Sequence, residues 1–233
     1  MSTANTNDTA VYEALRNGLI WGRWKSGEHL KPQHLRDEMN CTVSMLREAL
    51  LRLAGEGLVV SEKNHGFRAV AHSKETFREA AHLRLVLECE AAEMALAAGD
   101  FDWEMAVSAA HNKLTYVEKQ MLELNDVSEH LERWSRQDWE FHSTLLSACG
   151  STLLMRSYKS AFDTFRMYAV SEIRNFGFSA EITLDEHAAI YEAAVQRDKA
   201  NCIAAIERHL TLFENRNRSA EPVPEKKKIV VKK

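Results

Sequence analysis

The segment from Thr42 to Val70 changes its hydrophobic period partway along, and this change limits the folds open to the chain. Thr42 is a suitable N-cap for a helix that follows it. The apolar residues of that helix recur at amphipathic spacing, at Leu46, Ala49, Leu50 and Leu53. Two β-prone runs come next, residues 58–60 and 67–70, and residues 64–66 between them suit a tight turn because Asn and Gly tolerate positive φ. The segment therefore predicts a helix followed by a two-stranded ribbon.

Two shorter helical patterns precede this segment. Val11, Leu15 and Leu19 are spaced by four residues, which predicts an amphipathic helix. Pro32 lies near the first turn of a second, short helix, and Asn40 and Cys41 form a turn before the third. Helix, short helix, turn, helix and ribbon is the order of a winged helix-turn-helix, whose third helix can enter a major groove.

The third predicted helix leaves several residues outside its core face, namely Thr42, Val43, Ser44, Met45, Arg47, Glu48 and Arg52. Arg47 is the strongest candidate for a DNA contact, because a guanidinium fits guanine or a phosphate with two hydrogen bonds. The alternative is that Arg47 pairs with a neighbouring glutamate on a solvated face. Within this ordered pattern of elements we favour the DNA contact.

The stretch GEHLKPQHLRDEMNCTVSMLREALLRLAGEGLVV resembles the DNA-binding domain of the GntR family of bacterial transcription regulators. The resemblance implies that Arg47 contacts DNA, with Thr42 and Ser44 beside it, and that His65 and Gly66 form the tip of the wing near the minor groove. It also implies a homodimer on a palindromic double-stranded operator. Val43 stands where the family usually has an arginine, and Met45 where it often has a proline. We therefore expect an operator sequence that departs from the usual one.

Residues 73 to 217 contain only helical patterns, and Gly (9) and Pro (3) are scarce in the whole chain. Six predicted helices with short breaks indicate an antiparallel bundle, whose interior can hold a metal or cofactor. We expect a mainly α protein, with a winged helix-turn-helix in 9–72 and an all-α bundle in 73–217. Residues 1–8 and the Lys-rich tail 218–233 are expected to be disordered.

Charge is distributed unevenly along the chain. Residues 1–72 carry nine Lys/Arg and eight Asp/Glu, whereas residues 73–220 carry 16 and 24. An acidic body and a weakly basic head suggest two tasks on one chain, although this head alone would not indicate nucleic acid. We find no secretory signal in MSTANTNDTA and no apolar stretch long enough to span a bilayer. Four widely spaced cysteines predict reduced thiols in a cytoplasmic protein.

Asp138 and His142 lie one helical turn apart, so their side chains share one side of a helix. The pair is either a helix-surface contact or half of a metal site. His187 and His209 lie on the fifth and last helices of the predicted bundle. Each histidine taken singly is more commonly a surface or core residue. Together, one carboxylate and three imidazoles could bind a divalent transition metal such as Zn²⁺, Ni²⁺ or Mn²⁺.

DWEFH and DEHAAIYEAAVQRDKANCIAAIERHL resemble the FCD ligand domain of the FadR-like branch of GntR regulators. The resemblance implies metal ligation by four residues, Asp138, His142, His187 and His209. LRLVLE resembles the first-helix pattern of the branch, which implies that Arg84 points into the cavity with Glu88 one turn on. A small carboxylate could then fill open metal positions and reach Arg84. One departure is Ser151, where an asparagine commonly follows the glycine.

These observations predict a dimeric transcription factor, not an enzyme, whose operator binding responds to a small organic acid at a metal site. We name it a repressor in keeping with the resemblance, although the sequence leaves activation open. Two alternatives are a metal-dependent hydrolase and an interaction protein with a structural metal. The sequence offers no convincing general base beside the metal residues, and a hydrolase would not need the winged head.

Overall fold

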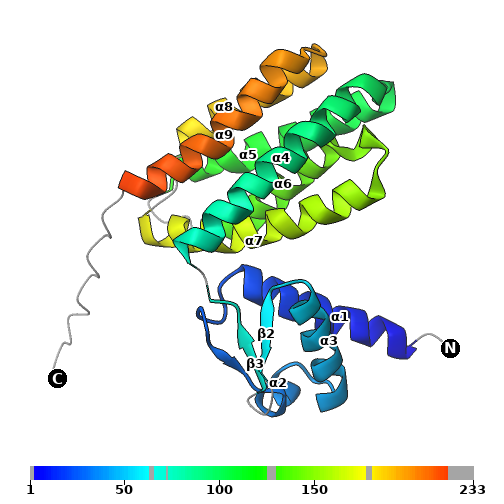
Figure 1. Cartoon of the computed structure of the whole chain (residues 1–233), viewed down its shortest axis with the longest axis vertical. Helices are drawn as coiled ribbons and strands as arrows, with labels where there is room; N and C mark the ends of the chain where they lie inside the picture. Colours follow the sequence, from blue (N-terminus) through cyan, green and yellow to red (C-terminus); the bar gives the residue numbers. More distant parts are fainter. Residues whose placement is uncertain (1–2, 63–65, 72, 125–129, 177–179, 220–233) are drawn as a thin grey trace.

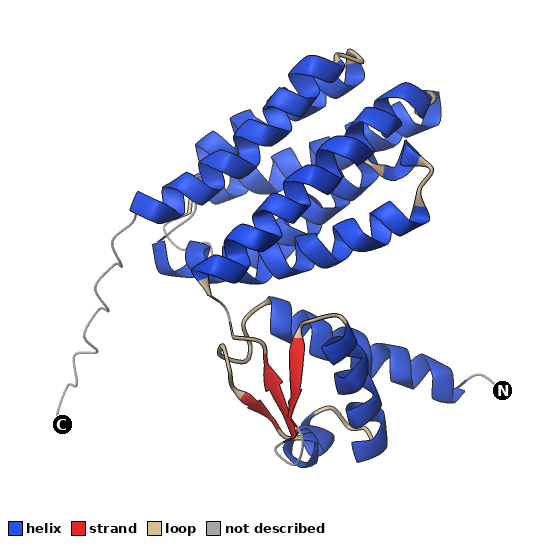
Figure 2. Ribbon diagram, in the orientation of Figure 1, coloured by secondary structure: helices blue, strands red, loops and turns tan. Residues whose placement is uncertain are grey.

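The computed structural model describes residues 3–62, 66–71, 73–124, 130–176 and 180–219. The N-terminal part, called the head below, contains three helices and three short strands (Figures 1 and 2). Its elements are α1 (Thr3–Ile20), β1 (His29–Leu30), α2 (Pro32–Glu38), α3 (Val43–Gly55), β2 (Val59–Glu62) and β3 (Gly66–Ala69). This order confirms the predicted winged helix-turn-helix.

Local chemistry at the start of α3 matches the sequence pattern. The Thr42 hydroxyl accepts a hydrogen bond from the Met45 backbone N–H at 3.2 Å, which caps the helix. Asn40 adopts a φ of 46°, in the left-handed region that asparagine tolerates better than most residues, and this turns the chain from α2 into α3. The apolar face of α3, with Leu46, Leu50 and Leu53 fully buried, forms the centre of the head core.

The sheet of the head has one strand more than the sequence predicted. Its order is β1-β3-β2, and both pairings are antiparallel. β1 contains only two residues, which is too short for a strand pattern to be read, and it forms because β3 offers backbone groups along its other edge. Gly66 begins β3 with a φ of 85°. His65, the other expected wing-tip residue, lies outside the described residues.

Six helices form the C-terminal part, called the bundle below (Figure 1). Among the described residues these are α4 (Lys74–Ala98), α5 (Phe101–Leu122), α6 (Leu131–Leu145), α7 (Thr152–Phe176), α8 (Ala180–Val195) and α9 (Lys199–Ser219), with a short 3₁₀ turn η1 (Ser147–Cys149). Hydroxyl or carboxylate caps begin several of them: Ser73 accepts from Thr76 N, Asp100 from Trp103 N, Ser151 from Leu154 N and Asp198 from Asn201 N. The predicted all-α bundle is therefore confirmed.

Three helix boundaries differ from those expected. α1 begins at Thr3, so the helix includes most of the segment 1–8 for which we expected disorder. The sequence pattern predicts a helix from about Val127 to Ala148, whereas α6 begins at Leu131 and ends at Leu145; residues 125–129 lie outside the described residues. The sequence TLDE at residues 183–186 is a capping-box pattern, which predicts a helix start at Thr183. The structure instead places Thr183 inside α8, where it is buried, because the preceding residues already belong to the helix.

Each part has its own hydrophobic core. The head core contains Leu15, Leu46 and Phe67 among others, and the bundle core contains residues from every bundle helix. Trp21 at the end of α1 packs against both cores. In the part of the chain that the structure describes, no helix combines the length and hydropathy needed to cross a bilayer.

Candidate functional site

Four side chains from three helices meet inside the bundle. Asp138 and His142 come from α6, His187 from α8 and His209 from α9, and all four are buried. One possible ligand atom from each residue lies within 4.8 Å of those of the others. The Nε2 atoms of His142 and His187 are 3.4 Å apart, and the Asp138 carboxylate lies 3.3 Å from the latter. The structure thus brings together the four residues singled out in the sequence; we call them the His₃Asp cluster.

Each imidazole of the His₃Asp cluster is held from behind by a glutamate. His142 Nδ1 lies 2.5 Å from Glu88 on α4, His187 Nδ1 lies 2.7 Å from Glu118 on α5, and His209 Nδ1 lies 2.9 Å from Glu186 on α8. A carboxylate at Nδ1 favours the tautomer that carries its proton there, which leaves Nε2 as the lone-pair donor. The three rings are therefore oriented to offer Nε2 to a common point.

The remaining helix, α7, reaches the cluster through Tyr158, whose hydroxyl donates to Glu88 at 3.0 Å. All six helices of the bundle therefore contribute a side chain to the site or to its immediate surroundings. Such a centre can form only when the whole bundle is folded, because its ligands are scattered over some 70 residues of sequence. Burial of so many polar groups also makes their mutual pairing essential.

The electrostatics of the cluster depend on its buried carboxylates. Burial alone would lower the pKa of His187, but Glu118 and Asp138 on either side raise it to about 10. Burial and the neighbouring His187 and His142 hold the pKa of His209 well below its ordinary value. Burial would raise the pKa of Asp138, yet its contacts with two imidazoles hold that pKa well below the ordinary value. His187 is therefore the imidazole of the cluster that its neighbouring carboxylates favour as a cation.

Arg84 lies beside the His₃Asp cluster and is almost fully buried. Its Nε donates to Glu88 at 2.9 Å, and its guanidinium lies over the rings of Phe162 and Phe165, at 4.4 and 4.8 Å from their centroids. Although burial opposes the charge, Glu88 raises the pKa of Arg84, so the guanidinium stays protonated. Its Nη2 is buried without a hydrogen-bond partner among the described protein atoms. An unmatched buried donor of this kind costs about 1–3 kcal/mol and suits an anionic ligand atom.

The donor set fits a divalent transition metal. Three imidazole nitrogens and one carboxylate oxygen are ligands that Zn²⁺, Ni²⁺ and Mn²⁺ accept. The glutamates behind the imidazoles match the usual arrangement around metal-binding histidines. Together with Arg84, the residues can hold a cation on one side and a carboxylate on the other.

Sequence reasoning missed three residues of this site: Glu118, Glu186 and Tyr158. Glu118 carried a usable signal, because it lies on the same face of α5 as the buried Leu114 and Met121. A carboxylate on an apolar helix face is rare unless it is paired. Glu186 directly precedes His187, and nothing in its spacing shows that it faces His209 instead. Tyr158 is one of several aromatic residues on α7 and has no distinguishing pattern.

The residues expected to face DNA lie on the open side of α3. Ser44 and Arg47 are exposed, and Arg47 has no ion-pair partner in the described parts of the chain. Thr42 is exposed as well, although its hydroxyl is engaged as the helix cap. Arg52 is different, because its guanidinium lies 3.8 Å from the centroid of the Tyr12 ring and 3.5 Å from Glu56. Among the described residues, the glutamate pairing is thus seen for Arg52, and no such pair is seen for Arg47.

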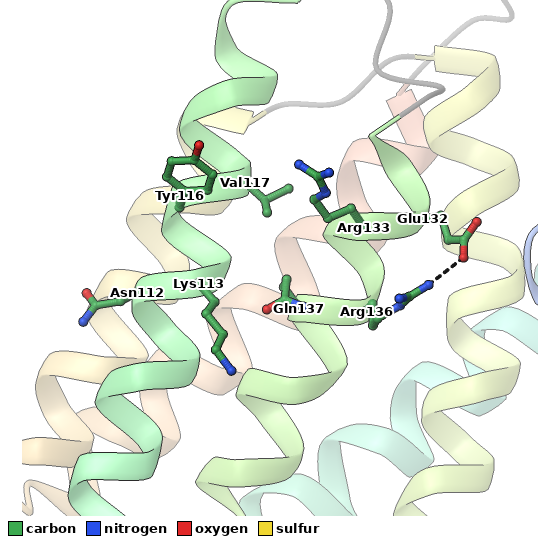
Figure 3. A pocket seen from close by; sticks show the side chains of 8 residues that line it. All are labelled: Asn112, Lys113, Tyr116, Val117, Glu132, Arg133, Arg136 and Gln137. Atoms are coloured by element: carbon green, nitrogen blue, oxygen red, sulfur yellow. Dashed lines mark hydrogen bonds and ion pairs between the residues drawn. The ribbon is translucent and has the colours of Figure 1, made fainter.

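A groove of about 720 Å³ opens on the outside of the bundle between α5 and α6 (Figure 3). It is lined by Asn112, Lys113, Tyr116, Val117, Glu132, Arg133, Arg136 and Gln137. Two of its three cations already have partners, since Lys113 contacts Glu140 at 2.6 Å and Arg136 contacts Glu132 at 2.7 Å. Exposed pairs of this kind contribute little. We therefore regard the groove as solvated surface, separate from the His₃Asp cluster.

Two known transcriptional regulators are similar in sequence to this chain over most of their length. The chain is 26% identical over 202 residues to the HTH-type transcriptional regulator BphR of Paraburkholderia xenovorans, with 86% of this chain and 81% of that protein covered. It is 29% identical over 203 residues to the HTH-type transcriptional repressor GlaR of Escherichia coli, with 85% and 90% covered.

Solved structures show the same fold. A putative GntR transcriptional regulator from Rhodococcus sp. RHA1 superposes with a TM-score of 0.74 at 21% identity, covering 93% of this chain and 99% of that one. Escherichia coli McbR/YncC gives a TM-score of 0.70 at 16% identity, covering 93% and 100%.

Two protein families match consecutive parts of the chain. Residues 7–68 match the gntR family of bacterial regulatory proteins, and residues 79–212 match the FCD domain. The first range contains the winged helix-turn-helix, and the second contains all four residues of the His₃Asp cluster. Members of this family are DNA-binding regulators and not enzymes, which removes the hydrolase alternative. The chain therefore belongs to the GntR family of bacterial transcriptional regulators, with an FCD domain as its C-terminal part.

Proposed function

We propose that this regulator senses a small organic acid at a metal held by the His₃Asp cluster and changes its operator binding in response. The observation that carries the proposal is the placement of Arg84. A buried guanidinium with an unpartnered Nη2 lies beside a cluster of four metal-type ligands. A metal cation and a guanidinium close together would make a site for an anion that has two oxygens to place.

Asp138, His142, His187 and His209 would hold the metal. A divalent ion there would supply a Lewis-acidic partner for one carboxylate oxygen of the effector. Arg84 would bind another oxygen through Nη2, while Glu88 fixes the guanidinium through Nε at 2.9 Å. Phe162 and Phe165 under the guanidinium would keep the anion away from water, which strengthens the charge interaction. The expected effector is a small carboxylate that fits beside these groups.

DNA recognition in this proposal uses the exposed side of α3. Arg47 would contact a base or phosphate, with Ser44 and Thr42 beside it at the start of the helix. Gly66, and His65 beyond the described residues, would lie at the tip of the wing. Val43 in place of an arginine removes one possible hydrogen-bond donor from this surface. The operator should therefore be read by fewer direct contacts near that position.

A homodimer would place two heads on a palindromic operator. The outer face of α4 supports a bundle-mediated dimer, because three large apolar side chains are exposed there. Leu83 is 49% exposed, Val86 52% and Met94 36%, and they are separated by three and eight residues, so they follow one stripe of the helix. Exposed apolar stripes of this type mark association surfaces.

Repression in the cytoplasm completes the proposal. Operator DNA is in the cytoplasm of a bacterium, and the relative from Escherichia coli is named a repressor. A purely structural metal is the remaining alternative. The exposed, unpaired Arg47 and the unpartnered Nη2 of Arg84 favour a regulator with an effector over that alternative, because a structural site needs no free anion-binding group beside it.

The test uses full-length protein in metal-free and zinc-loaded forms. Metal content is measured by elemental analysis, and thermal shift is measured with a panel of small mono- and dicarboxylates. We expect about one ion per chain, and at least one acid that stabilises only the zinc-loaded form. Arg84→Gln should keep the metal and lose that stabilisation. A metal-loaded protein that responds to no acid in the panel and keeps the same operator affinity throughout would indicate a structural metal.

A further inference from the structure

The head and the bundle meet through α1 and α7, and a buried ion pair lies in that contact. Arg16 on α1 donates to Asp163 on α7, and their side chains are only 9% and 7% exposed. Met167, one turn beyond Asp163, is part of the head core although it belongs to a bundle helix. Figure 1 shows α7 along the side of the bundle that faces the head. One face of α7 is therefore built into the head.

Another face of the same stretch of α7 belongs to the effector site. Tyr158 donates to Glu88 at 3.0 Å, and the ring of Phe162 lies under the Arg84 guanidinium at 4.4 Å. Arg166 approaches the same Phe162 ring, at 5.4 Å from its centroid. Phe162 thus contacts one guanidinium that lines the effector site and another that faces the head.

Arg166 connects this ring to the interdomain ion pair. Its Nη2 donates to Asp163 Oδ1 at 2.8 Å, while Arg16 takes the other carboxylate oxygen. Each residue therefore contacts the next in the series Arg84, Phe162, Arg166, Asp163 and Arg16. This series joins the effector site to the first helix of the head within three turns of α7.

The contact between α1 and α7 depends on the charge of one residue, Asp163. Among the described residues, Asp163 is the only carboxylate in direct contact with the two buried guanidiniums of Arg16 and Arg166, and it also receives Lys159 from the more exposed side. The Nε atoms of Arg16 and Arg166 and the Nε1 of Trp21 are buried without hydrogen-bond partners in the described protein. Buried donors in a rigid core normally have hydrogen-bond partners, so a contact with several unmatched donors is a candidate for rearrangement. Its present arrangement depends on one carboxylate.

We propose that the Arg16–Asp163 ion pair is the contact through which the state of the effector site sets the position of the DNA-binding head. The proposal rests on the function proposed above and specifies its regulation. A ligand shifts such an equilibrium only by its differential affinity for two arrangements. Arg84 would supply that difference, because an anion bound at its free Nη2 would shift the guanidinium on the Phe162 ring while Glu88 still holds Nε, and the same ring contacts Arg166. Although α4 follows the wing directly in sequence, this route passes through α7.

The test measures backbone hydrogen exchange and operator affinity on the full-length protein in three states: metal-free, with Zn²⁺ alone, and with Zn²⁺ plus an acid found by thermal shift. The variants are Asp163→Asn, Arg16→Gln, the double variant, and the conservative variants Asp163→Glu and Arg16→Lys, which keep the charges of the contact. Lys113→Gln is the matched control, because it breaks an exposed ion pair with Glu140 far from the head. Exchange is followed in the last two turns of α1 and in residues 159–167 of α7.

We expect Asp163→Asn and Arg16→Gln each to speed exchange in α1 by at least about tenfold, since each leaves buried charge without its partner. The double variant should add little to either single variant. The changes in α1 exchange and operator affinity caused by Zn²⁺ and the acid should disappear in both single variants and persist in Asp163→Glu and Arg16→Lys. The Lys113→Gln protein should behave as the wild type.

Wild-type exchange in α1 and an intact zinc response in Asp163→Asn would overturn the proposal. Single variants that fail to fold while Asp163→Glu and Arg16→Lys fold and respond would support it, because these two variants keep both charges of the pair. A wild-type protein whose exchange and operator affinity both ignore Zn²⁺ together with every acid of the thermal-shift panel would instead contradict the sensor proposed above. In that case the exchange difference between wild type and Asp163→Asn still decides whether the ion pair holds the head.

Discussion

His187 lies between two carboxylates, with Glu118 2.7 Å from its Nδ1 and Asp138 3.3 Å from its Nε2. Each carboxylate favours a proton on the nitrogen that faces it, so the imidazole is held as a cation when no metal competes. His209 and His111 have lowered pKa values, the latter about 4, because burial and the charge on His187 both oppose protonation. Burial and the charge on His187 thus disfavour protonation of these two neighbouring imidazoles, and a divalent cation would have to displace the proton on His187 Nε2.

A pH prediction follows for the metal-free protein. The pKa of His187 is raised from an ordinary 6.5 to about 10, so its stabilising effect is fully present below 6.5 and is lost as pH rises through 10. We expect the melting temperature of chelator-treated protein to fall between about pH 7 and pH 10. In His187→Gln this slope should be much shallower, and His82→Gln, an exposed-site control, should retain it. Identical profiles in His187→Gln and wild type would show that the imidazolium is not what stabilises the metal-free site.

The second residue-scale prediction concerns Arg47 on the exposed side of α3. Arg47→Ala should weaken specific operator binding by roughly 1–3 kcal/mol, the usual range for a bidentate contact. Arg133→Ala, which removes an exposed arginine of the bundle, is the matched control. Binding is compared by titration at one fixed salt concentration, since phosphate contacts are salt-dependent. Retention of wild-type affinity by Arg47→Ala, or an equal loss in the control, would contradict the assignment.

Among the elements, α5 has the least expected role. It carries none of the proposed metal ligands, yet its Glu118 joins three helices. Glu118 accepts a hydrogen bond from Trp134 Nε1 on α6 at 3.2 Å and contacts His187 Nδ1 on α8 at 2.7 Å. Its second carboxylate oxygen is buried without a partner among the described residues. α5 therefore supplies the charge behind a ligand that another helix presents.

Glu118→Gln tests this role of α5. Glutamine keeps the shape of the side chain and removes its charge, so the bundle should fold while His187 becomes a weaker donor. We expect zinc affinity to fall by about 10- to 100-fold, the usual effect of changing a residue that holds a metal-binding histidine. Competition with a zinc chelator measures the affinity, and Glu140→Gln serves as the exposed control on α6. Equal zinc affinity in Glu118→Gln and wild type would mean that the charge on α5 does not support the site.

Most of the helices could be predicted from the sequence, but one strand and one helix start could not. The helices of the head and α4 to α9 follow from apolar spacing, because each buries one face that repeats along the chain. β1 could not be predicted, since two residues carry no period and pair only because β3 lies beside them. The start of α8 was misplaced because the capping-box pattern at Thr183 is local, whereas the helix is held by packing around it.

Some residues of the site could be predicted from the sequence and others could not, because the sequence shows only local spacing. Asp138 and His142 share one helix, so their spacing alone places them together. His187 and His209 come from other helices, and only the resemblance to the FCD domain joined them to the pair. Glu118 and Glu186 are set by how helices pack side by side, which no local spacing records. Their roles became visible only in the assembled bundle.

At the scale of the whole molecule, the two parts differ in charge and in task. The weakly positive head carries an exposed arginine on α3, and the acidic bundle encloses a buried cluster of four metal-type ligands. The two parts are covalently joined before α4 and also touch through α1 and α7. A signal generated in the bundle therefore has a packed side-chain route to the head and does not depend on the linker alone.

His187→Ala separates sensing from DNA binding in the complete protein. His187 lies in the bundle and touches no residue of the head in the described structure, so basal operator affinity should remain close to wild type. Without this ligand the metal site is incomplete, so an acid that changes wild-type operator affinity should change that of the variant far less. Coupling energies between two such sites are typically 1–3 kcal/mol, or about 5- to 150-fold in affinity. Operator affinity is measured with and without an acid identified by thermal shift, with His82→Ala as the control. An undiminished response in His187→Ala would exclude this cluster as the sensor, whereas loss of operator binding without any acid would show that the cluster maintains the fold on which the head depends.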